Sequence, residues 1–264
     1  MLDPVPRRGE VAPGRRSRAP VRAAGEKAWW LLRDPAARRA VWLWRRHPAN
    51  LFQPFNDTGT DRYPEVFSCL RSALARVERP LVVSFGCSTG QEVFTLRQYL
   101  PSARLIGLDI NPANIRDARR ALAGAPDGDV RFEVAGDTAS IPSGAADAVV
   151  AMAVFRHGDL AEHPSPSCSH RLRFAAFERT LADIDRCLRP GGLLAIEFSS
   201  FRFADARTAE GYDCVLAVQR PPHPRVPLYG PDEQLLEDQR YGELVFAKRG
   251  GGPGSVPPAP GAAG

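Results

Sequence analysis

The sequence has no run of about 18 apolar residues without a charge, and its arginine-rich start lacks the apolar segment of a secretory signal. It has only five cysteines, an odd number without close paired spacing, which predicts free thiols rather than a disulfide framework. Lysine occurs only as Lys27 and Lys248. These absences predict a cytoplasmic protein without a membrane span.

The charge is uneven along the chain. Residues 1–46 carry twelve Lys or Arg against four Asp or Glu, a net charge of +8, so the other 218 residues sum to −3 within the total of +5. A mildly acidic body argues against nucleic acid as the partner of the folded domain. With 264 residues, 44% of them hydrophobic and 25% charged, the composition is typical of one globular domain with appendages.

The two ends do not have the composition of packed structure. Residues 1–25 predict a disordered basic arm, and residues 250–264, GGGPGSVPPAPGAAG, predict a disordered tail. Residues 26–61 are expected to form an N-terminal helical cover, with two short helices interrupted at Pro35 and ending before Pro48. This stretch holds all the tryptophans, Trp29, Trp30, Trp42 and Trp44. Packing of the aromatic face on its own domain is favoured over a helix on a membrane surface.

From residue 62 to 249 the chain alternates apolar runs with amphipathic stretches, the pattern of a parallel sheet between two helix layers. Strands are expected at 81–85, 104–108, 130–134, 148–152 and 193–198. Helices are expected near 65–77 and at 91–100, 113–122 and 171–188. Two later strands, 212–219 and 243–248, flank a proline-rich loop and are placed as an antiparallel pair that closes the sheet.

The strongest chemical signal is LVVSFGCSTGQEVFTL at 81–96, where an apolar strand runs through a glycine turn into a helix. Gly86 lets backbone pass close to a ligand, and Gly90 does the same at the helix start, where free N–H groups point outward. Such a turn holds a small molecule at the carboxyl edge of the sheet. Because Cys87, Ser88 and Thr89 separate the two glycines, the turn is not G-x-G-x-x-G, which disfavours NAD.

Two acidic residues follow the next strands. Asp109 ends the second strand, where a carboxylate accepts hydrogen bonds from the hydroxyls of a ribose. Asn111 before Pro112 is the better helix cap, which leaves Asp109 free for a ligand. Asp137 follows the third strand and either reaches an adenine amino group or forms an Asx-turn. Together with Glu92, these acids favour a cationic nucleoside joined to an amino acid, and S-adenosylmethionine has those properties.

The run from about 56 to 198 resembles the class I S-adenosylmethionine-dependent methyltransferases, through the glycine loop, Asp109, the loop GDTASIP and the segment CLRPGGLLAIEF. Within that superfamily the loop CSTGQEVFTL resembles the CheR-type chemotaxis-receptor methyltransferases. The resemblance implies a Rossmann-like seven-stranded methyltransferase sandwich. It also implies that Asn56, Thr58 and Arg62, in the spacing N-x-T-x-x-x-R, contact the amino acid part of the cofactor, with Glu92 facing its amino group.

The resemblance specifies the cofactor and not the acceptor. Thr60 and Asp61 stand where the chemotaxis family has paired phenylalanines, and residues 147–157, DAVVAMAVFRH, lack its arginine-asparagine pair. The segment after the fourth strand is the acceptor side, and His157 there has the reference pKa of a general base. An ordinary loop histidine is the alternative. His157, His163, Cys168 and His170 are able to bind zinc, but their spacing matches no closed site, so no metal is predicted.

The sequence therefore predicts a methyltransferase that passes a methyl group from S-adenosyl-L-methionine to an unknown acceptor by direct in-line displacement. The alternative is a non-catalytic module that binds S-adenosylmethionine as a sensor or regulator. A nicotinamide-dependent reductase on a similar sheet is a second alternative.

Overall fold

The computed structural model describes residues 35–47, 50–53, 62–223 and 225–250. The chain divides into two units, residues 1–42 and 43–264, and the architecture given below is that of the second. The predicted basic arm and most of the predicted tail lie outside the described residues. Within the predicted helical cover, helix α2 (Pro35–Arg46) begins at Pro35, a position where the ring fits because the first N–H of a helix has no partner.

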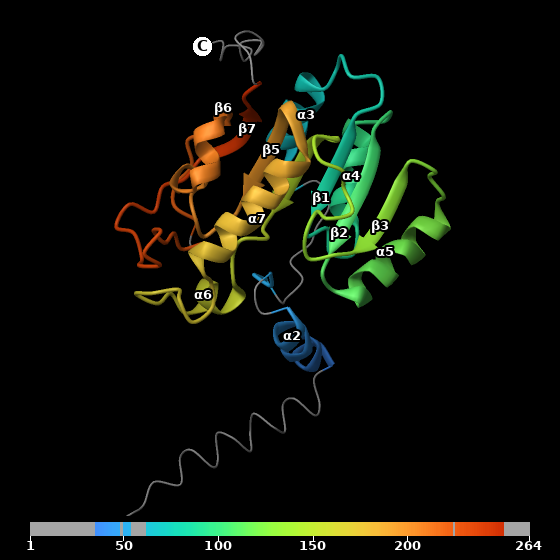
Figure 1. Ribbon diagram of the computed structural model, residues 1–264. Helices are drawn as coiled ribbons and strands as arrows, with labels where there is room; N and C mark the ends of the chain where they lie inside the picture. The colour runs from blue at the N-terminus through green and yellow to red at the C-terminus, as the bar shows by residue number, and fades with distance from the viewer. Residues whose placement is uncertain (1–34, 48–49, 54–61, 224, 251–264) are drawn as a thin grey trace, which may run out of the picture. The chain divides into compact units, whose positions relative to one another are not determined.

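The second unit is built around a seven-stranded sheet with the order β3-β2-β1-β4-β5-β7-β6 (Figure 1). The strands β1 to β5 pair in parallel, and β7 pairs antiparallel with both β5 and β6. The predicted seven-stranded α/β fold and its antiparallel closing pair are therefore confirmed. The strands are β1 (Leu81–Phe85), β2 (Arg104–Asp109), β3 (Val130–Val134), β4 (Ala146–Met152), β5 (Leu188–Glu197), β6 (Tyr212–Ala217) and β7 (Glu243–Lys248).

Alternate residues of the central strands face two separate apolar layers. Val83 and Val149 pack in the layer that includes Phe177 of helix α7, whereas Val82 and Val150 pack in the other layer. Helices of that second layer are α3 (Pro64–Ala73), α4 (Gln91–Tyr99) and α5 (Pro112–Gly124), and α7 spans Phe174–Cys187. Because both faces of the central strands are covered, their polar chemistry is confined to the strand ends. None of the described helices is long and apolar enough to cross a membrane.

Several elements differ from the sequence expectation. α3 ends at Ala73 and not near 77, α7 begins at Phe174 and not at 171, and β6 ends at Ala217 and not at 219. β4 begins at Ala146, two residues earlier than expected. β5 begins at Leu188, because the segment LRPGG continues as backbone of the strand instead of ending a helix. The short helix α6 (Gly158–Glu162) was not predicted, since five residues are too few to show a helical period.

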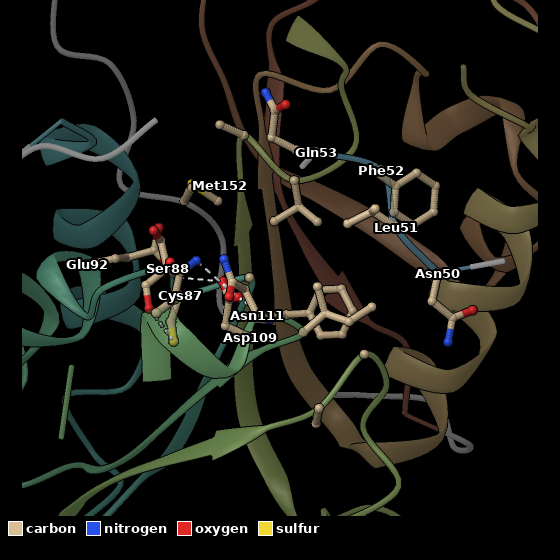
Figure 2. A pocket seen from close by; sticks show the side chains of 18 of the residues that line it. Asn50, Leu51, Phe52, Gln53, Cys87, Ser88, Glu92, Asp109, Asn111 and Met152 are labelled. Atoms are coloured by element: carbon tan, nitrogen blue, oxygen red, sulfur yellow. Dashed lines mark hydrogen bonds between the residues drawn. The ribbon is translucent and has the colours of Figure 1, made fainter. Parts of the chain in front are cut away.

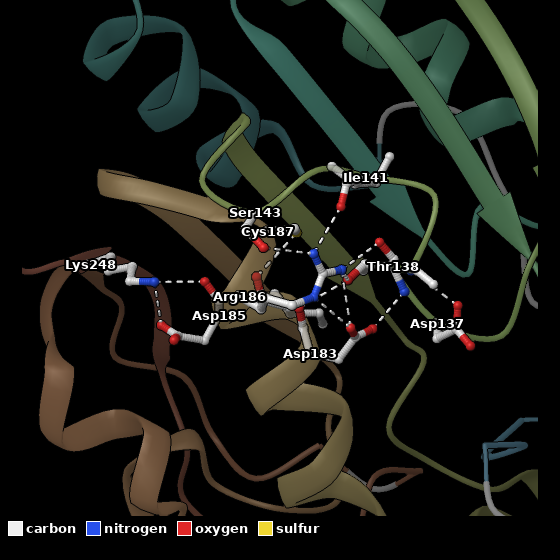
Figure 3. A network of polar contacts seen from close by, with 11 residues as sticks. Asp137, Thr138, Ile141, Ser143, Asp183, Asp185, Arg186, Cys187 and Lys248 are labelled. Carbon is white, nitrogen blue, oxygen red and sulfur yellow. Dashed lines mark hydrogen bonds and ion pairs between the residues drawn. The ribbon is translucent and has the colours of Figure 1, made fainter.

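The loop from β3 to β4 is fastened to the end of α7 by Arg186 (Figure 3). The guanidinium donates to the carbonyls of Thr138 and Ile141 at 2.7 and 3.0 Å. It also pairs with Asp183, whose Oδ2 accepts the N–H of Thr138 at 2.6 Å. Gly144 N–H closes the network by donating to the Arg186 carbonyl at 2.9 Å. The side chain of Arg186 thus holds this loop from Thr138 to Ser143, and its backbone carbonyl holds Gly144.

Substitution Arg186→Ala is expected to lower the free energy of unfolding by about 2 kcal/mol, because the loop carbonyls lose a charged donor. Urea denaturation monitored by circular dichroism measures this change. Arg179→Ala is the control, since Arg179 is an exposed arginine of the same helix. Equal losses for the two variants would show that the network adds nothing beyond the helix itself.

Candidate active site

A pocket lies where β1, β2 and β4 end, at the carboxyl edge of the parallel strands (Figure 2). We call it the β1 pocket. Its walls come from the turn after β1, from the ends of β2 and β4, and from residues 50–53. The strand order reverses at β1, and open α/β sheets bind ligands at such a point. The pocket measures about 90 Å³ with residues 50–53 in its wall.

The turn after β1 is held tightly against the end of β2. Gly86 and Cys87 both donate their N–H to the carbonyl of Leu108, at 2.8 and 2.9 Å. Gly86 has φ of +76°, and a Cβ there would lie 2.5 Å from Cγ2 of Val154. Glycine is therefore required at this position both for its backbone conformation and for the close approach of the segment after β4.

The predicted residues of the turn divide into two groups. Gly86 and Ser88 line the pocket, with Ser88 in the left-handed region at φ of +51°. Gly90 does not line the pocket. A Cβ at this position would lie 2.9 Å from Cζ of Phe132, so the glycine packs against that ring. Thr89 donates its hydroxyl to Oε1 of Gln91 at 2.5 Å and also lies outside the lining. Gly90 and Thr89 thus shape the turn, and Gly86 and Ser88 face the ligand space.

Asp109 ends β2 in the pocket wall. The sequence predicts that its side chain is free for a ligand, but the structure shows it hydrogen-bonded to three protein groups. Oδ2 accepts the N–H of Ser88 at 2.8 Å, while Oδ1 accepts the N–H of Asn111 at 2.8 Å and Nδ2 of Asn114 at 3.2 Å. Burial raises the pKa of Asp109, and these three hydrogen bonds act against the rise. Oδ2, with one protein donor, keeps capacity for a ligand hydroxyl.

The helix cap beside Asp109 agrees with the prediction. Asn111 accepts the N–H of Ala113 with its side chain at 3.0 Å, and Pro112 occupies the first turn of α5. Asn111 and Asn114 also line the pocket, which the sequence reasoning missed because it treated Asn111 as a cap alone.

Glu92 faces the pocket from the first turn of α4 and accepts the hydroxyl of Ser84 at 2.7 Å. Burial raises the pKa of Glu92 to about 8, while the hydrogen bond from Ser84 and the charge of Arg62 act in the opposite direction. Arg62 lines the same pocket and lies over the ring of Tyr63, 5.4 Å from its centroid. The positions predicted for Asn56 and Thr58 lie outside the described residues.

Asp137 forms the Asx-turn that is one of its two predicted readings. Its Oδ1 accepts the N–H of Ala139 at 3.1 Å, which is an Asx-turn, and the residue is exposed. Ala135 and Gly136, which precede it, line the β1 pocket, whereas Asp137 does not. Its predicted contact with an adenine amino group stays a prediction.

His157 lies outside the residues that line the β1 pocket. It caps the N-terminus of α6, since its Nδ1 accepts the N–H of Asp159 at 3.2 Å. Burial lowers the pKa of His157 to about 4, and the charge of Asp159 acts against this shift. A neutral imidazole accepts this hydrogen bond at Nδ1, as a helix cap requires. The role of His157 as a general base stays a prediction.

Two buried polar atoms in the pocket wall have no hydrogen-bond partner within the described part of the chain, Oγ of Ser88 and Oε1 of Gln53. Buried polar atoms without a hydrogen-bond partner destabilise a folded protein. They mark places where a ligand supplies the missing hydrogen bond. The sequence reasoning missed Gln53 because residues 50–53 carry no motif. Across the described residues no group of three His, Cys, Asp or Glu side chains is placed to hold a metal ion.

The neighbouring strands β4 and β5 both end in strained backbone. Ala153 has φ of +58° and Phe198 has φ of +53°, a conformation that costs a residue with a side chain about 1–2 kcal/mol. The two ends are tied together, because Ala153 N–H donates to the carbonyl of Glu197 at 2.8 Å. Strain of this kind persists at functional sites when the surrounding structure holds it in place.

Comparisons with known proteins agree with this geometry. Residues 83–194 match a family profile described as a methyltransferase domain. A 4-amino-L-phenylalanine/4-methylamino-L-phenylalanine methyltransferase of Streptomyces pristinaespiralis is 30% identical over 165 residues, which cover 53% of this chain and 54% of that protein. A trans-aconitate 2-methyltransferase of Deinococcus radiodurans is 35% identical over 146 residues, 52% of this chain and 47% of that protein. The chain thus spans about half the length of these curated relatives.

Solved structures give more distant matches. A structure described by the conversion of a disulfide bond into a thioacetal group during echinomycin biosynthesis has 19% identity and a TM-score of 0.43, covering 68% of this chain and 81% of that one. An amino pentose methyltransferase from Micromonospora echinaspora has 24% identity and a TM-score of 0.37, covering 54% of this chain and 51% of that one.

The matched residues 83–194 run from β1 to β5, the parallel strands of the sheet. This match supports the predicted resemblance to the class I S-adenosylmethionine-dependent methyltransferases. The finer resemblance of the glycine loop to the CheR-type methyltransferases stays a prediction.

Gly86→Ala is expected to destabilise the protein by about 2–4 kcal/mol, because it combines a left-handed backbone with a clash against Val154. Gly144→Ala is the matched control, since Gly144 has φ of +65° and nothing within 4 Å of an added Cβ. Its cost isolates the backbone contribution, about 1 kcal/mol. Thermal denaturation measures both, and equal costs would contradict the close approach to Val154.

The raised pKa of Glu92 makes the stability of the ligand-free protein depend on pH. The folded state keeps a proton on Glu92 up to about pH 8, whereas the unfolded state loses it near 4.5. The free energy of unfolding that the proton on Glu92 contributes is therefore complete below pH 4.5 and is lost as the pH rises toward 8. Glu92→Gln is expected to flatten this fall in urea titrations at several pH values. The exposed Glu78→Gln is expected to leave it unchanged, and a wild-type curve as flat as that of Glu92→Gln would contradict the assignment.

Proposed function

We propose that this chain binds S-adenosylmethionine in the β1 pocket and transfers its methyl group to an acceptor. The observation that carries the proposal is the burial of two acids, Glu92 and Asp109, on either side of a glycine turn at the switch point of the sheet. The relatives support the same class of reaction, since those named above are methyltransferases.

The residues of the pocket fit this cofactor by their chemistry. The unmet Oγ of Ser88 and Oε1 of Gln53 offer polar contacts inside the wall. A carboxyl that burial keeps protonated, Glu92, becomes a stable carboxylate when an ammonium group lies beside it.

Each side chain then has a distinct task. Glu92 accepts hydrogen bonds from the amino group of the cofactor, and Arg62, in the same wall, pairs with its carboxylate. Asp109 uses Oδ2 for a ribose hydroxyl while it keeps Ser88 in place. When bound, the cofactor supplies an electrophilic methyl group on a sulfonium. The protein's part is to hold this group in line with an acceptor and to keep water out.

The alternative, a sensor that binds the cofactor without turnover, shares every contact in the β1 pocket. A nicotinamide reductase would need space for a pyrophosphate beside the turn, and Ser88 and Thr89 occupy the positions where a second glycine would clear it. Methyl transfer separates the enzyme from the sensor.

The experiment has two arms. Calorimetric titration with S-adenosylhomocysteine tests binding, and incubation with methyl-labelled S-adenosylmethionine and a fractionated extract tests transfer of the label. Arg62→Ala and Glu92→Gln are each expected to weaken binding by about tenfold or more, with Glu78→Gln as control. Absence of binding would refute the proposal, and binding without label transfer to any fraction would favour the sensor.

Cofactor binding is also expected to release a proton from Glu92 near pH 7, because a bound ammonium lowers the raised pKa of this carboxyl. Titrations in buffers with different enthalpies of ionisation measure the number of protons released. Glu92→Gln is expected to abolish the release. A wild type that releases no proton would show that the ammonium does not lie beside Glu92.

A further inference from the structure

A second cavity, of about 250 Å³, opens beyond the end of β5. We call it the β5 cavity. Its polar wall comes from Glu197, the last residue of β5, and from Arg220 and Tyr241. Ser199, His223 and Gln239 add further polar groups, and the apolar part of the wall is formed by Phe198, Pro221, Pro222, Val226, Leu228 and Leu244. It has the composition of a site for a small organic molecule, with apolar walls and a few polar groups that fix orientation.

The β5 cavity adjoins the β1 pocket. Met152 in the wall of the β1 pocket pairs in register with Glu197, and the N–H of Ala153 donates to the Glu197 carbonyl at 2.8 Å. The rings of Tyr63 and Phe198, which belong to the two walls, have centroids 5.9 Å apart. A molecule in the β5 cavity is therefore next to a molecule in the β1 pocket, at the same edge of the sheet.

Glu197 is an unusual residue for an apolar wall. Its side chain is 4% exposed, and one carboxylate oxygen, Oε1, accepts a hydrogen bond from Arg220. The other oxygen, Oε2, is buried and has no hydrogen-bond partner within the described residues. A buried carboxylate oxygen without a hydrogen-bond donor lowers the stability of the protein. A ligand that donates a hydrogen bond to Oε2 would remove this loss.

The charge around this oxygen selects the kind of ligand. Arg220 pairs with Glu197 and with Glu65 of α3, so one guanidinium serves two carboxylates. The charge of Arg62 also acts to lower the pKa of Glu197, as it does for Glu92 in the β1 pocket. Among the described residues that line the cavity, Arg220 supplies the guanidinium, and it is already shared between two carboxylates. A cation or a neutral hydrogen-bond donor fits, and a carboxylate does not.

We propose that the β5 cavity is the acceptor site and that it takes an amine with an apolar body, whose N–H donates to Oε2 of Glu197. This proposal rests on the proposed function, because it places the acceptor beside the cofactor. The amine nitrogen forms a bond to the methyl carbon with its lone pair, as the carbon–sulfur bond breaks and leaves its electron pair on sulfur. The nitrogen gains the positive charge and then gives a proton to Glu197, from which it passes to solvent.

Burial raises the pKa of Glu197, which suits a carboxylate that accepts a proton, while Arg220 acts in the opposite direction. The ring of Phe198 packs against His223 with centroids 4.8 Å apart and closes the cavity on that side. An aryl or alkyl body of the acceptor is then held by Phe198, Val226 and Leu228, with its nitrogen at the polar end.

The test measures binding of three probes with the same body, 2-phenylethylamine, 2-phenylethanol and 3-phenylpropanoate, by calorimetry in the presence of saturating S-adenosylhomocysteine. The amine is expected to bind about tenfold more tightly than the acid. Glu197→Gln is expected to weaken amine binding by about tenfold while the affinity for S-adenosylhomocysteine stays within a factor of about two. Glu78→Gln, the same chemical change in the exposed segment before β1, is expected to change neither.

Val226→Phe serves as a second variant if Glu197→Gln does not fold, because it fills the cavity from a position without an ion pair. It is expected to abolish amine binding and to spare S-adenosylhomocysteine. The inference is overturned if the acid binds as well as the amine, if the amine does not bind at millimolar concentration, or if both variants bind it like the wild type. Failure of S-adenosylhomocysteine to bind the wild type would instead refute the proposed function itself.

Discussion

The carboxylate of Asp109 is the interaction on which the rest of the site depends. It stands at the end of β2 and accepts N–H groups from two different segments, Ser88 after β1 and Asn111 before α5. One buried carboxylate therefore fixes the glycine turn relative to the start of the next helix. The Leu108 carbonyl, which receives the N–H groups of Gly86 and Cys87, reinforces the same junction. The positions of Gly86, Ser88 and Asn111 in the pocket wall follow from this junction.

Much of the fold could be predicted because its signals are local. The strands 81–85, 130–134 and 243–248 were placed with the bounds that the structure shows. LVVSF and the centre of ELVFAK are apolar runs, and VRFEV alternates apolar with charged residues, and both patterns are typical of strands. The closing antiparallel pair was also predicted. The start of β5 was not, because LRPGG contains proline and glycine, which usually end an element. Here these residues lie at the strand's start, where pairing to β4 is already irregular.

The site was predicted only in part, for a physical reason. Gly86, Ser88, Glu92 and Asp109 lie on the segments that leave β1 and β2, so their strand positions alone bring them to one pocket. The fold alone brings residues 50–53 into the β1 pocket, and it alone assembles the residues of the β5 cavity. Their spacing in the sequence does not predict either set. Asp137 and His157 show why position alone does not assign a role, because a polar residue after a strand serves equally well in a turn or as a helix cap.

The left-handed backbone at Ala153 and Phe198 constrains how this protein can diversify. Both residues leave strands at the junction of the β1 pocket and the β5 cavity, where branched side chains would be costly. Descendants that acquire a new acceptor therefore cannot readily rebuild the floor between the two compartments. Variation is less constrained in the outer wall, at the exposed residues Pro221, Pro222 and His223 of the connection between β6 and β7.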